Sequence, residues 1–133
     1  MKFKRIKFKI KCYDPFFNET EREAIGWDFG LDNFALNRPW RIRFLKKNWY
    51  VTHLPTGSTF ASKCEFKKRE YAIDFAIRLR NYLVKKHKAD MSKSEASYYR
   101  KLKTGKYVRR LESEFIRQKK AIPRIEFEHI SKI

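Results

Sequence analysis

Six carboxylates gather in one short segment of a chain that is otherwise rich in cations. The segment covers residues 14–32, its one basic residue is Arg22, and its acids are Asp14, Glu19, Glu21, Glu23, Asp28 and Asp32. Clustered carboxylates can hold the divalent cations that assist phosphodiester hydrolysis. The same groups can equally pair with the protein's own cations or contact a basic protein partner, so three interpretations of this segment are open.

The other reactive residue types lack the spacing that catalysis or metal binding requires. Cys12 and Cys64 form no Cys-x-x-Cys pair, and the three histidines are scattered at His53, His87 and His129. The chain has no glycine-rich phosphate loop and no HExxH or GxSxG motif, and the Asp-Phe-Gly at 28–30 lacks the other parts of a kinase. We therefore predict no enzyme activity, no metal and no cofactor, with a metal-dependent nuclease as the least favoured alternative.

The net charge is the strongest indication of a partner. The 133 residues contain 33 Lys and Arg against 15 Asp and Glu, which gives a formal net charge of +18 and a pI near 10.1. In a chain of this size, such an excess is typical of proteins that bind nucleic acid. Charge alone does not distinguish DNA from RNA.

The composition predicts one folded domain over residues 1–133. Hydrophobic residues make up 42% of the chain and aromatic residues 17%, which is enough for a core and unlike a disordered basic tail. No apolar run approaches the ~20 residues of a membrane span, and no signal peptide is recognisable. We predict a cytoplasmic protein without membrane contact, in which both cysteines are reduced and buried.

The first predicted element is a strand over residues 2–12 with one basic face. Apolar residues alternate with cations, as Ile6, Phe8, Ile10 and Cys12 against Arg5, Lys7, Lys9 and Lys11. This period of two indicates a strand with one buried face. A row of cations along a strand can follow a phosphate backbone, which makes Lys7, Lys9 and Lys11 candidate contacts. A solvated strand face is the alternative.

The acidic segment is predicted to contain a short helix. Asn18 and Glu21 have the spacing of a capping box, which favours a helix from about Glu19 to Ile25 that ends at Gly26. The residues from there to Trp40 are rich in aromatic and turn-forming types, and we interpret them as a packed connection.

Residues 40–66 carry the clearest prediction of a sheet, an antiparallel meander. In the first strand, Trp40, Ile42 and Phe44 alternate with Arg41 and Arg43, and a turn with Lys46 and Lys47 follows. The second strand is Trp49–Leu54. After a turn at 55–58, Thr59–Phe66 forms the third strand. Cations beside aromatic rings on a sheet can hold a nucleic-acid backbone while a ring stacks on a base. Because Trp49 and Tyr50 point to opposite faces, one covering helix would leave one of them exposed; core packing is the alternative for each.

Two helical regions follow the meander. An apolar stripe at helical spacing predicts a helix over 67–88 packed on the sheet, with Arg78 on its outer face. Residues 89–121 are predicted as a basic helical hairpin with helices at 93–103 and 106–121. Its second helix carries Arg109, Arg110 and Arg117 on the outer side, whereas its first is weakly apolar. We therefore interpret the hairpin as an appendage that is mobile or that orders on binding.

The last predicted element is a short strand within residues 122–133. Its acids Glu126 and Glu128 match the outward lysines of the first strand, and opposite charges on neighbouring strands are stabilising. The hypothesis is that the terminal strands pair. Glu126→Lys with Glu128→Lys should then lower the melting temperature, and an unchanged value would contradict the pairing.

One stretch resembles a known kind of DNA-binding module. Residues 49–79, WYVTHLPTGSTFASKCEFKKREYAIDFAIRL, are similar in layout to the three-strand-plus-helix modules of phage integrase arms and plant AP2 domains. In those families the sheet enters the major groove, so the resemblance favours double-stranded DNA. It covers this stretch alone, shares no specific motif and assigns no residue a role.

These patterns predict an α+β domain. An antiparallel sheet of four or five strands packs on one main helix at about 67–88, followed by the basic helical hairpin and the C-terminal strand. The predicted function is non-catalytic binding of the phosphate backbone of DNA or RNA. The alternatives are a subunit of a ribonucleoprotein assembly, or a small regulator or inhibitor, including one of phage origin, that binds a nucleic-acid enzyme. The candidate contacts are Lys7, Lys9, Lys11, Arg41, Arg43, Lys46, Lys47, Trp49, Tyr50, Arg78, Arg109, Arg110 and Arg117.

Overall fold

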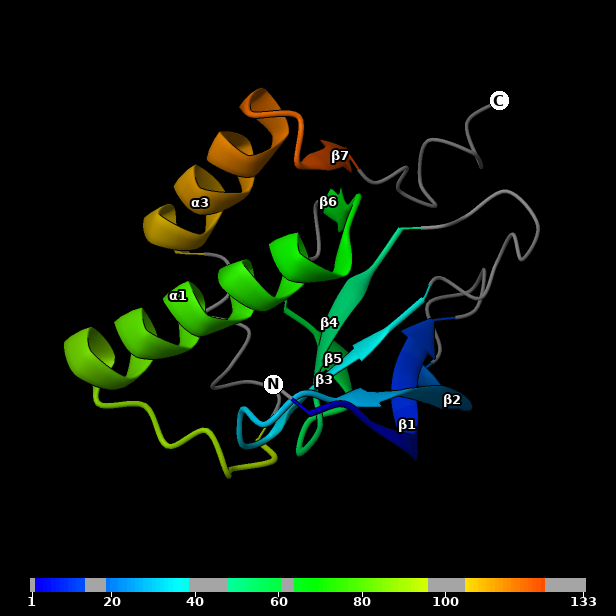
Figure 1. Cartoon of the computed structure of the whole chain (residues 1–133). Coiled ribbons are helices and arrows are strands. Elements are labelled where there is room, and N and C mark those ends of the chain that lie inside the picture. The colour runs from blue at the N-terminus through cyan, green and yellow to red at the C-terminus, as the bar shows by residue number, and fades with distance from the viewer. Residues whose placement is uncertain (1, 14–18, 39–47, 61–63, 96–104, 124–133) are drawn as a thin grey trace.

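The computed structural model describes residues 2–13, 19–38, 48–60, 64–95 and 105–123, and it has an α+β arrangement (Figure 1). Five antiparallel strands form one sheet in the order β1-β2-β3-β4-β5, and β6 and β7 form a second sheet of two strands. The elements are β1 Lys4–Tyr13, β2 Glu19–Asp28, β3 Phe34–Asn37, β4 Tyr50–His53, β5 Ser58–Thr59, β6 Cys64–Phe66, α1 Arg69–His87, α3 Lys106–Arg117 and β7 Ala121–Pro123. Within these residues, no helix is long and apolar enough to cross a bilayer.

The first strand is confirmed, but its neighbour is a strand where the sequence predicted a helix. β2 pairs with β1 over its whole length, with Lys9 opposite Glu23 and Lys11 opposite Glu21. The capping-box interpretation was wrong because Glu19, Glu21 and Glu23 recur every second residue. That period places them on one face of a strand, beside the lysines of β1.

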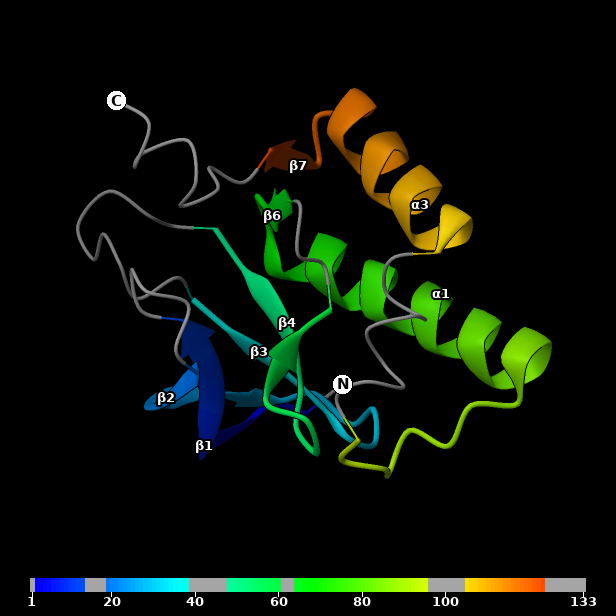
Figure 2. The same cartoon turned by 180° about the vertical axis from the view of Figure 1, so that it is seen from behind.

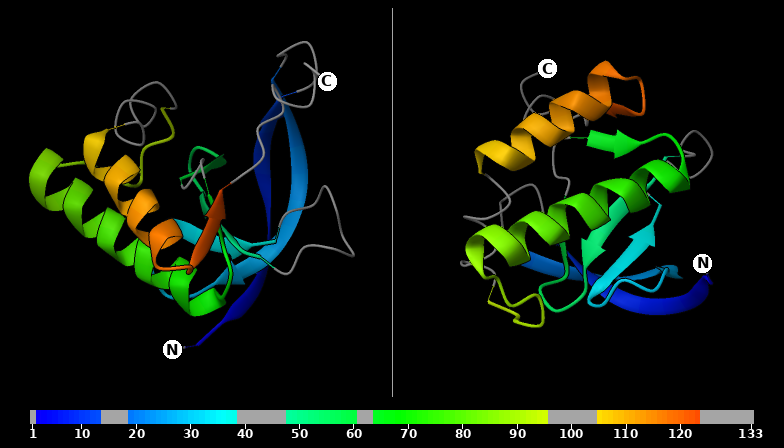
Figure 3. Two further views of the ribbon diagram at one scale, coloured as in Figure 1. Left: turned by 90° about the horizontal axis from the view of Figure 1, so that it is seen from above. Right: turned by 60° about the vertical axis from the view of Figure 1, so that its left-hand side comes forward.

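The long β1–β2 ribbon curls back toward the far edge of the sheet (Figure 3). The backbone N–H of Lys11 donates to the carbonyl oxygen of Gly57, in the turn between β4 and β5, at 2.8 Å. Gly26 permits the close approach of β2 to β3, because a Cβ at this position would lie 2.1 Å from the carbonyl oxygen of Leu36. The two ends of the five-stranded sheet are thereby brought together.

The connection predicted between residue 26 and Trp40 contains a strand that the sequence did not reveal. β3 is buried along its whole length, so it lacks the alternation of apolar and polar residues that marks a half-exposed strand. It pairs with β4 through Phe34 opposite His53 and Leu36 opposite Val51. The interpretation of this segment as packed was therefore right, but its assignment as a connection was incomplete.

The predicted meander is confirmed in part. The strand at 49–54 and the turn at 55–58 correspond to β4 and the turn that precedes β5. The third predicted strand, Thr59–Phe66, divides into β5 of the large sheet and β6, which pairs with β7. Trp49 forms a bridge to Phe66 and so connects the two sheets. The strand predicted around Arg41 and Arg43 lies outside the described residues.

Helix α1 is confirmed, and its apolar stripe faces the sheet. The buried side chains Ala72, Phe75, Ala76, Leu79 and Leu83 belong to one core cluster that also includes residues of β3, β4 and β6. Burial of such a stripe is the main source of stability for a helix on a sheet.

The second helix of the predicted hairpin is confirmed as α3, which lies alongside α1 (Figures 1 and 2). Tyr82 meets Tyr107 near one end of the pair, and Phe75 meets Phe115 further along, so the two helices run antiparallel. Of the first predicted helix, residues 93–95 are not helical and the rest lies outside the described residues.

A short C-terminal strand is confirmed, and it begins at Ala121. β7 spans Ala121–Pro123 and pairs with β6, with Ala121 opposite Phe66. Residues Glu126 and Glu128, which the sequence suggested as partners for the first strand, lie outside the described residues. Over the described residues, the acids that face the lysines of β1 are those of β2.

Candidate nucleic-acid interface

Two basic runs that are distant in the sequence meet where α1 begins and α3 ends. The backbone N–H of Lys67 donates to the carbonyl oxygen of Lys120 at 2.9 Å, directly beside the β6–β7 pair. This bond holds residues 67–69 against residues 119–120. We call the resulting surface the 67/120 patch, made of Lys67, Lys68, Arg69, Arg117, Lys119 and Lys120.

The end of α3 explains how the second run is positioned. Lys119 adopts a left-handed conformation, with φ 61°. Its N–H donates to the carbonyl oxygen of Ile116, and the N–H of Lys120 donates to that of Phe115. These two bonds form a Schellman motif, which ends the helix and turns the chain back toward β6. Lys120 is thereby placed over α1.

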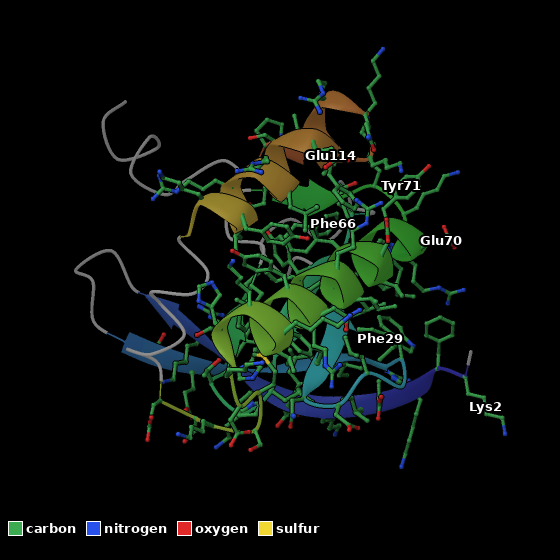
Figure 4. The ribbon with its side chains drawn as sticks, turned by 90° about the vertical axis from the view of Figure 1, so that its left-hand side faces the viewer. Lys2, Phe29, Phe66, Glu70, Tyr71 and Glu114 are labelled. Atoms are coloured by element: carbon green, nitrogen blue, oxygen red, sulfur yellow. The ribbon has the colours of Figure 1, made fainter. Side chains whose placement is uncertain are left out.

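An aromatic side chain lies within the 67/120 patch. The half-buried ring of Tyr71 has the ammonium of Lys68 5.8 Å and that of Lys120 5.6 Å from its centroid. Tyr71 and Glu70 both lie at the start of α1 (Figure 4). The guanidinium of Arg69 lies 4.1 Å from the ring centroid of Phe3. Cations next to a ring can bind phosphate while the ring contacts a base or a sugar.

The cations of this patch differ in their setting from Lys7, Lys9 and Arg78, which form ion pairs with acids. Over the described parts of the chain, none of the six has a carboxylate within 4.0 Å. Five of them are exposed to solvent, and Lys120 is half-buried. Like charges held close together repel one another, so this surface favours a polyanion.

The lysines predicted on the first strand have a different setting. Lys7 pairs with Glu23 at 3.9 Å and Lys9 with Glu21 at 3.7 Å, and all four side chains are more than half exposed. Exposed pairs of this length are weak, so the lysines can still exchange partners. Lys11, opposite Glu21, is half-buried and donates its backbone N–H to Gly57. The proposal that the acids pair with the protein's own cations is confirmed for Glu21 and Glu23.

Trp49 and Tyr50 are both buried, with 8% and 5% of their surface exposed. The core alternative is therefore confirmed for both residues, because both faces of the strand are covered. Trp49 belongs to the core cluster under α1, packs edge-on against Trp27 at 5.3 Å and is covered by Arg38 at 4.3 Å. Tyr50 lies outside that cluster and points to the opposite face of the strand, so that face is covered as well.

The predicted arginines that the structure describes fall into two groups. The guanidinium of Arg78 contacts Asp74 at 3.2 Å and Glu114 at 3.7 Å, and so bridges α1 and α3. Arg109, Arg110 and Arg117 are exposed on α3. Arg41, Arg43, Lys46 and Lys47 lie outside the described residues, so their role stays a prediction.

Cys64 is an inert core residue, as its sequence context suggested. It is buried, and burial raises the pKa of its thiol well above the usual range, with the nearby Glu112 carboxylate adding to the shift. A thiol held in this state does not act as a nucleophile near neutral pH. In the residues for which coordinates are described, no group of three His, Cys, Asp or Glu side chains is placed to hold a metal ion.

Most residues of the 67/120 patch were not among the contacts predicted from the sequence. Lys67, Lys68 and Arg69 are adjacent in the sequence, as are Lys119 and Lys120, and these runs were the available signal. Their meeting depends on the pairing of β6 with β7, which no local pattern announces. A scan against protein-family models, a search of curated proteins and a search of solved structures each find no match to this chain.

Proposed function

We propose that this protein binds nucleic acid without catalysis, and that the 67/120 patch is its main contact with the phosphate backbone. The observation that carries the proposal is the unpaired charge of this patch. Two of its six cations, Lys68 and Lys120, lie 5.8 and 5.6 Å from the centroid of the Tyr71 ring. Each cation that replaces a counterion of the polyanion contributes to affinity, independently of sequence.

The distribution of acids supports the same choice of surface. Glu21 and Glu23 offset the lysines of the β1–β2 ribbon, and Asp74 and Glu114 offset Arg78. A metal-dependent active site would need such carboxylates close together and available for a cation. The paired arrangement favours a structural role for them, which supports binding without catalysis.

The test is a salt titration of binding, with fluorescence anisotropy as the readout. The ligands are matched single-stranded and duplex DNA and single-stranded and duplex RNA. Lys67→Gln with Lys119→Gln removes two exposed cations of the patch. It should weaken binding and reduce the slope of log K against log salt by about 1.4 to 1.8, which is 0.7 to 0.9 for each lost phosphate contact.

The matched control is Lys7→Gln with Lys9→Gln. It removes the same charge from the ribbon, where the lysines face acids, so it should change the slope less. Equal changes of the slope in the two double variants would show that binding reflects net charge and not the patch. Binding of no ligand at any salt concentration would overturn the proposed function and direct attention to a protein or ribonucleoprotein partner.

A further inference from the structure

Two tyrosines on neighbouring helices form a stack at the other end of the α1–α3 pair. The ring centroids of Tyr82 in α1 and Tyr107 in α3 lie 3.8 Å apart, with 12° between their planes. The ring of His87 meets Tyr82 edge-on at 5.4 Å. Both tyrosines are half-buried and His87 is exposed, so the stack is partly accessible to solvent.

Cations lie on the same side of both helices as the stack. Lys85 and Lys86 follow Tyr82 by three and four residues, and Arg110 follows Tyr107 by three, which are the spacings of one helix face. All three cations are exposed. Within the described chain, none of them has a carboxylate within 4.0 Å.

The stack and the 67/120 patch are separated by a distance that one ligand can span. Tyr71 and Tyr82 are eleven residues apart on α1, which corresponds to about 16 Å along the helix axis. Nucleotides that keep base stacking advance by roughly 3.4 Å each along a strand, so about five of them cover this length. A single strand can therefore contact both clusters.

We propose that the α1–α3 face takes single-stranded nucleic acid, with a base stacked on the Tyr82–Tyr107 pair. The proposal rests on the proposed function, because it names the form of nucleic acid that the same surface binds. The exposed cations hold the phosphates, and the tyrosines contact a base that no complementary strand occupies. In a duplex the bases are already stacked and paired, so the tyrosines would contribute nothing.

The stack also joins α1 to α3, so its role in binding must be separated from its role in packing. Tyr107→Phe keeps the aromatic ring, whereas Tyr107→Leu keeps an apolar side chain without a ring face. The two variants should therefore differ in base stacking more than in the packing of the helices. Circular dichroism and the melting temperature of each variant establish that it is folded.

The experiment compares three ligands of equal length by fluorescence anisotropy: a thymidine strand, an abasic strand with the same phosphates, and a duplex. The native protein should bind the thymidine strand at least about fivefold more tightly than the abasic strand, the lower end of the contribution of one stacked base. Tyr107→Phe should keep this ratio, and Tyr107→Leu should bring it close to one. Lys85→Gln with Lys86→Gln should lower the affinity for both the thymidine and the abasic strand and leave the ratio of the two affinities unchanged.

A second measurement uses the native protein alone, in case Tyr107→Leu does not fold. A strand containing 4-thiothymidine is crosslinked by ultraviolet light, and the modified peptides are identified. Crosslinks at Tyr82 or Tyr107 support the proposal, and crosslinks confined to other segments contradict it.

The possible failures are distinguishable. Equal affinity for the thymidine and abasic strands, or a preference for the duplex, overturns the single-strand proposal and leaves the proposed function intact. Absence of binding to all three ligands overturns both.

Discussion

His53 shows how one buried polar residue can fix the position of a loop. Its ring is fully buried between Phe34 and Phe60. Its Nε2–H donates to the carbonyl oxygen of Met91 at 2.6 Å, and its Nδ1 accepts from the hydroxyl of Thr56 at 2.9 Å. The carbonyl can only accept, so the neutral ring must carry its proton on Nε2. The loop after α1 is thereby attached to β4.

This arrangement predicts a loss of stability at acid pH. Burial lowers the pKa of His53 below its ordinary value of 6.5. The unfolded chain therefore binds a proton that the folded chain does not, and the free energy of unfolding falls as the pH drops below 6.5, by up to about 1.4 kcal/mol per unit. Urea unfolding at about pH 7.5 and about pH 5.5 measures this difference.

The variant His53→Gln provides the control for this titration. It should be less stable at neutral pH, because the core and the bond to Met91 are disturbed. Its free energy of unfolding should depend less on pH than that of the native protein. An equal pH dependence in both proteins would assign the acid sensitivity to other groups.

At the scale of elements, the β1–β2 ribbon depends on a match of charge between its strands. Lys9 lies opposite Glu23 and Lys11 opposite Glu21, and the ion pairs join Lys7 to Glu23 and Lys9 to Glu21. A ribbon of four outward cations without these acids would suffer repulsion along its whole length. The acidic segment thus makes it possible for a basic strand to belong to a sheet.

Reversal of the acids should destabilise the ribbon. Glu21→Lys with Glu23→Lys places like charges opposite one another, at a cost of roughly 0.2 to 1 kcal/mol for each pair. We expect the melting temperature to fall by a few degrees. Asp32→Lys with Glu95→Lys makes the same change in net charge at exposed positions elsewhere and should have a smaller effect. A similar fall in both variants would show that net charge, and not cross-strand pairing, sets the stability.

The elements also show which parts of the fold the sequence could predict. Helix α1 and strand β1 have clear periods, so Phe75 and Leu79 in the helix, and Ile10 in the strand, indicated the inward faces directly. β3 was missed because it is buried along its whole length and shows no alternation. β2 was misassigned because the spacing of Asn18 and Glu21 fits a helix cap, whereas pairing with β1 favours a strand.

The basic character of the candidate surface could be predicted from the sequence, but its position could not. The charge and the aromatic residues indicated nucleic acid, and Arg109, Arg110 and Arg117 are exposed as expected. Trp49 and Tyr50 are buried because both faces of β4 are covered. Neither this cover nor the junction of Lys67 with Lys120 follows from a local pattern.

At the scale of the whole molecule, the net charge of +18 opposes compaction. Salt screens this repulsion, with a Debye length that falls to ~10 Å at 0.1 M. We predict that the melting temperature of the free protein rises as sodium chloride increases from about 50 mM to about 300 mM, while affinity for nucleic acid falls. Differential scanning fluorimetry measures the first trend. A melting temperature that is constant or falls with salt would show that the ion pairs outweigh the repulsion.

The pairing of β6 with β7 has a consequence for the order in which the chain acquires its properties. The two strands are about 55 residues apart in sequence, and contacts of such separation form late because a long loop must close first. During synthesis, β1, β2 and α1 emerge well before Lys119 and Lys120 do. A partly synthesised chain therefore carries only half of the 67/120 patch, and the polyanion binding that we propose for the complete patch must wait until residues 121–123 have left the ribosome.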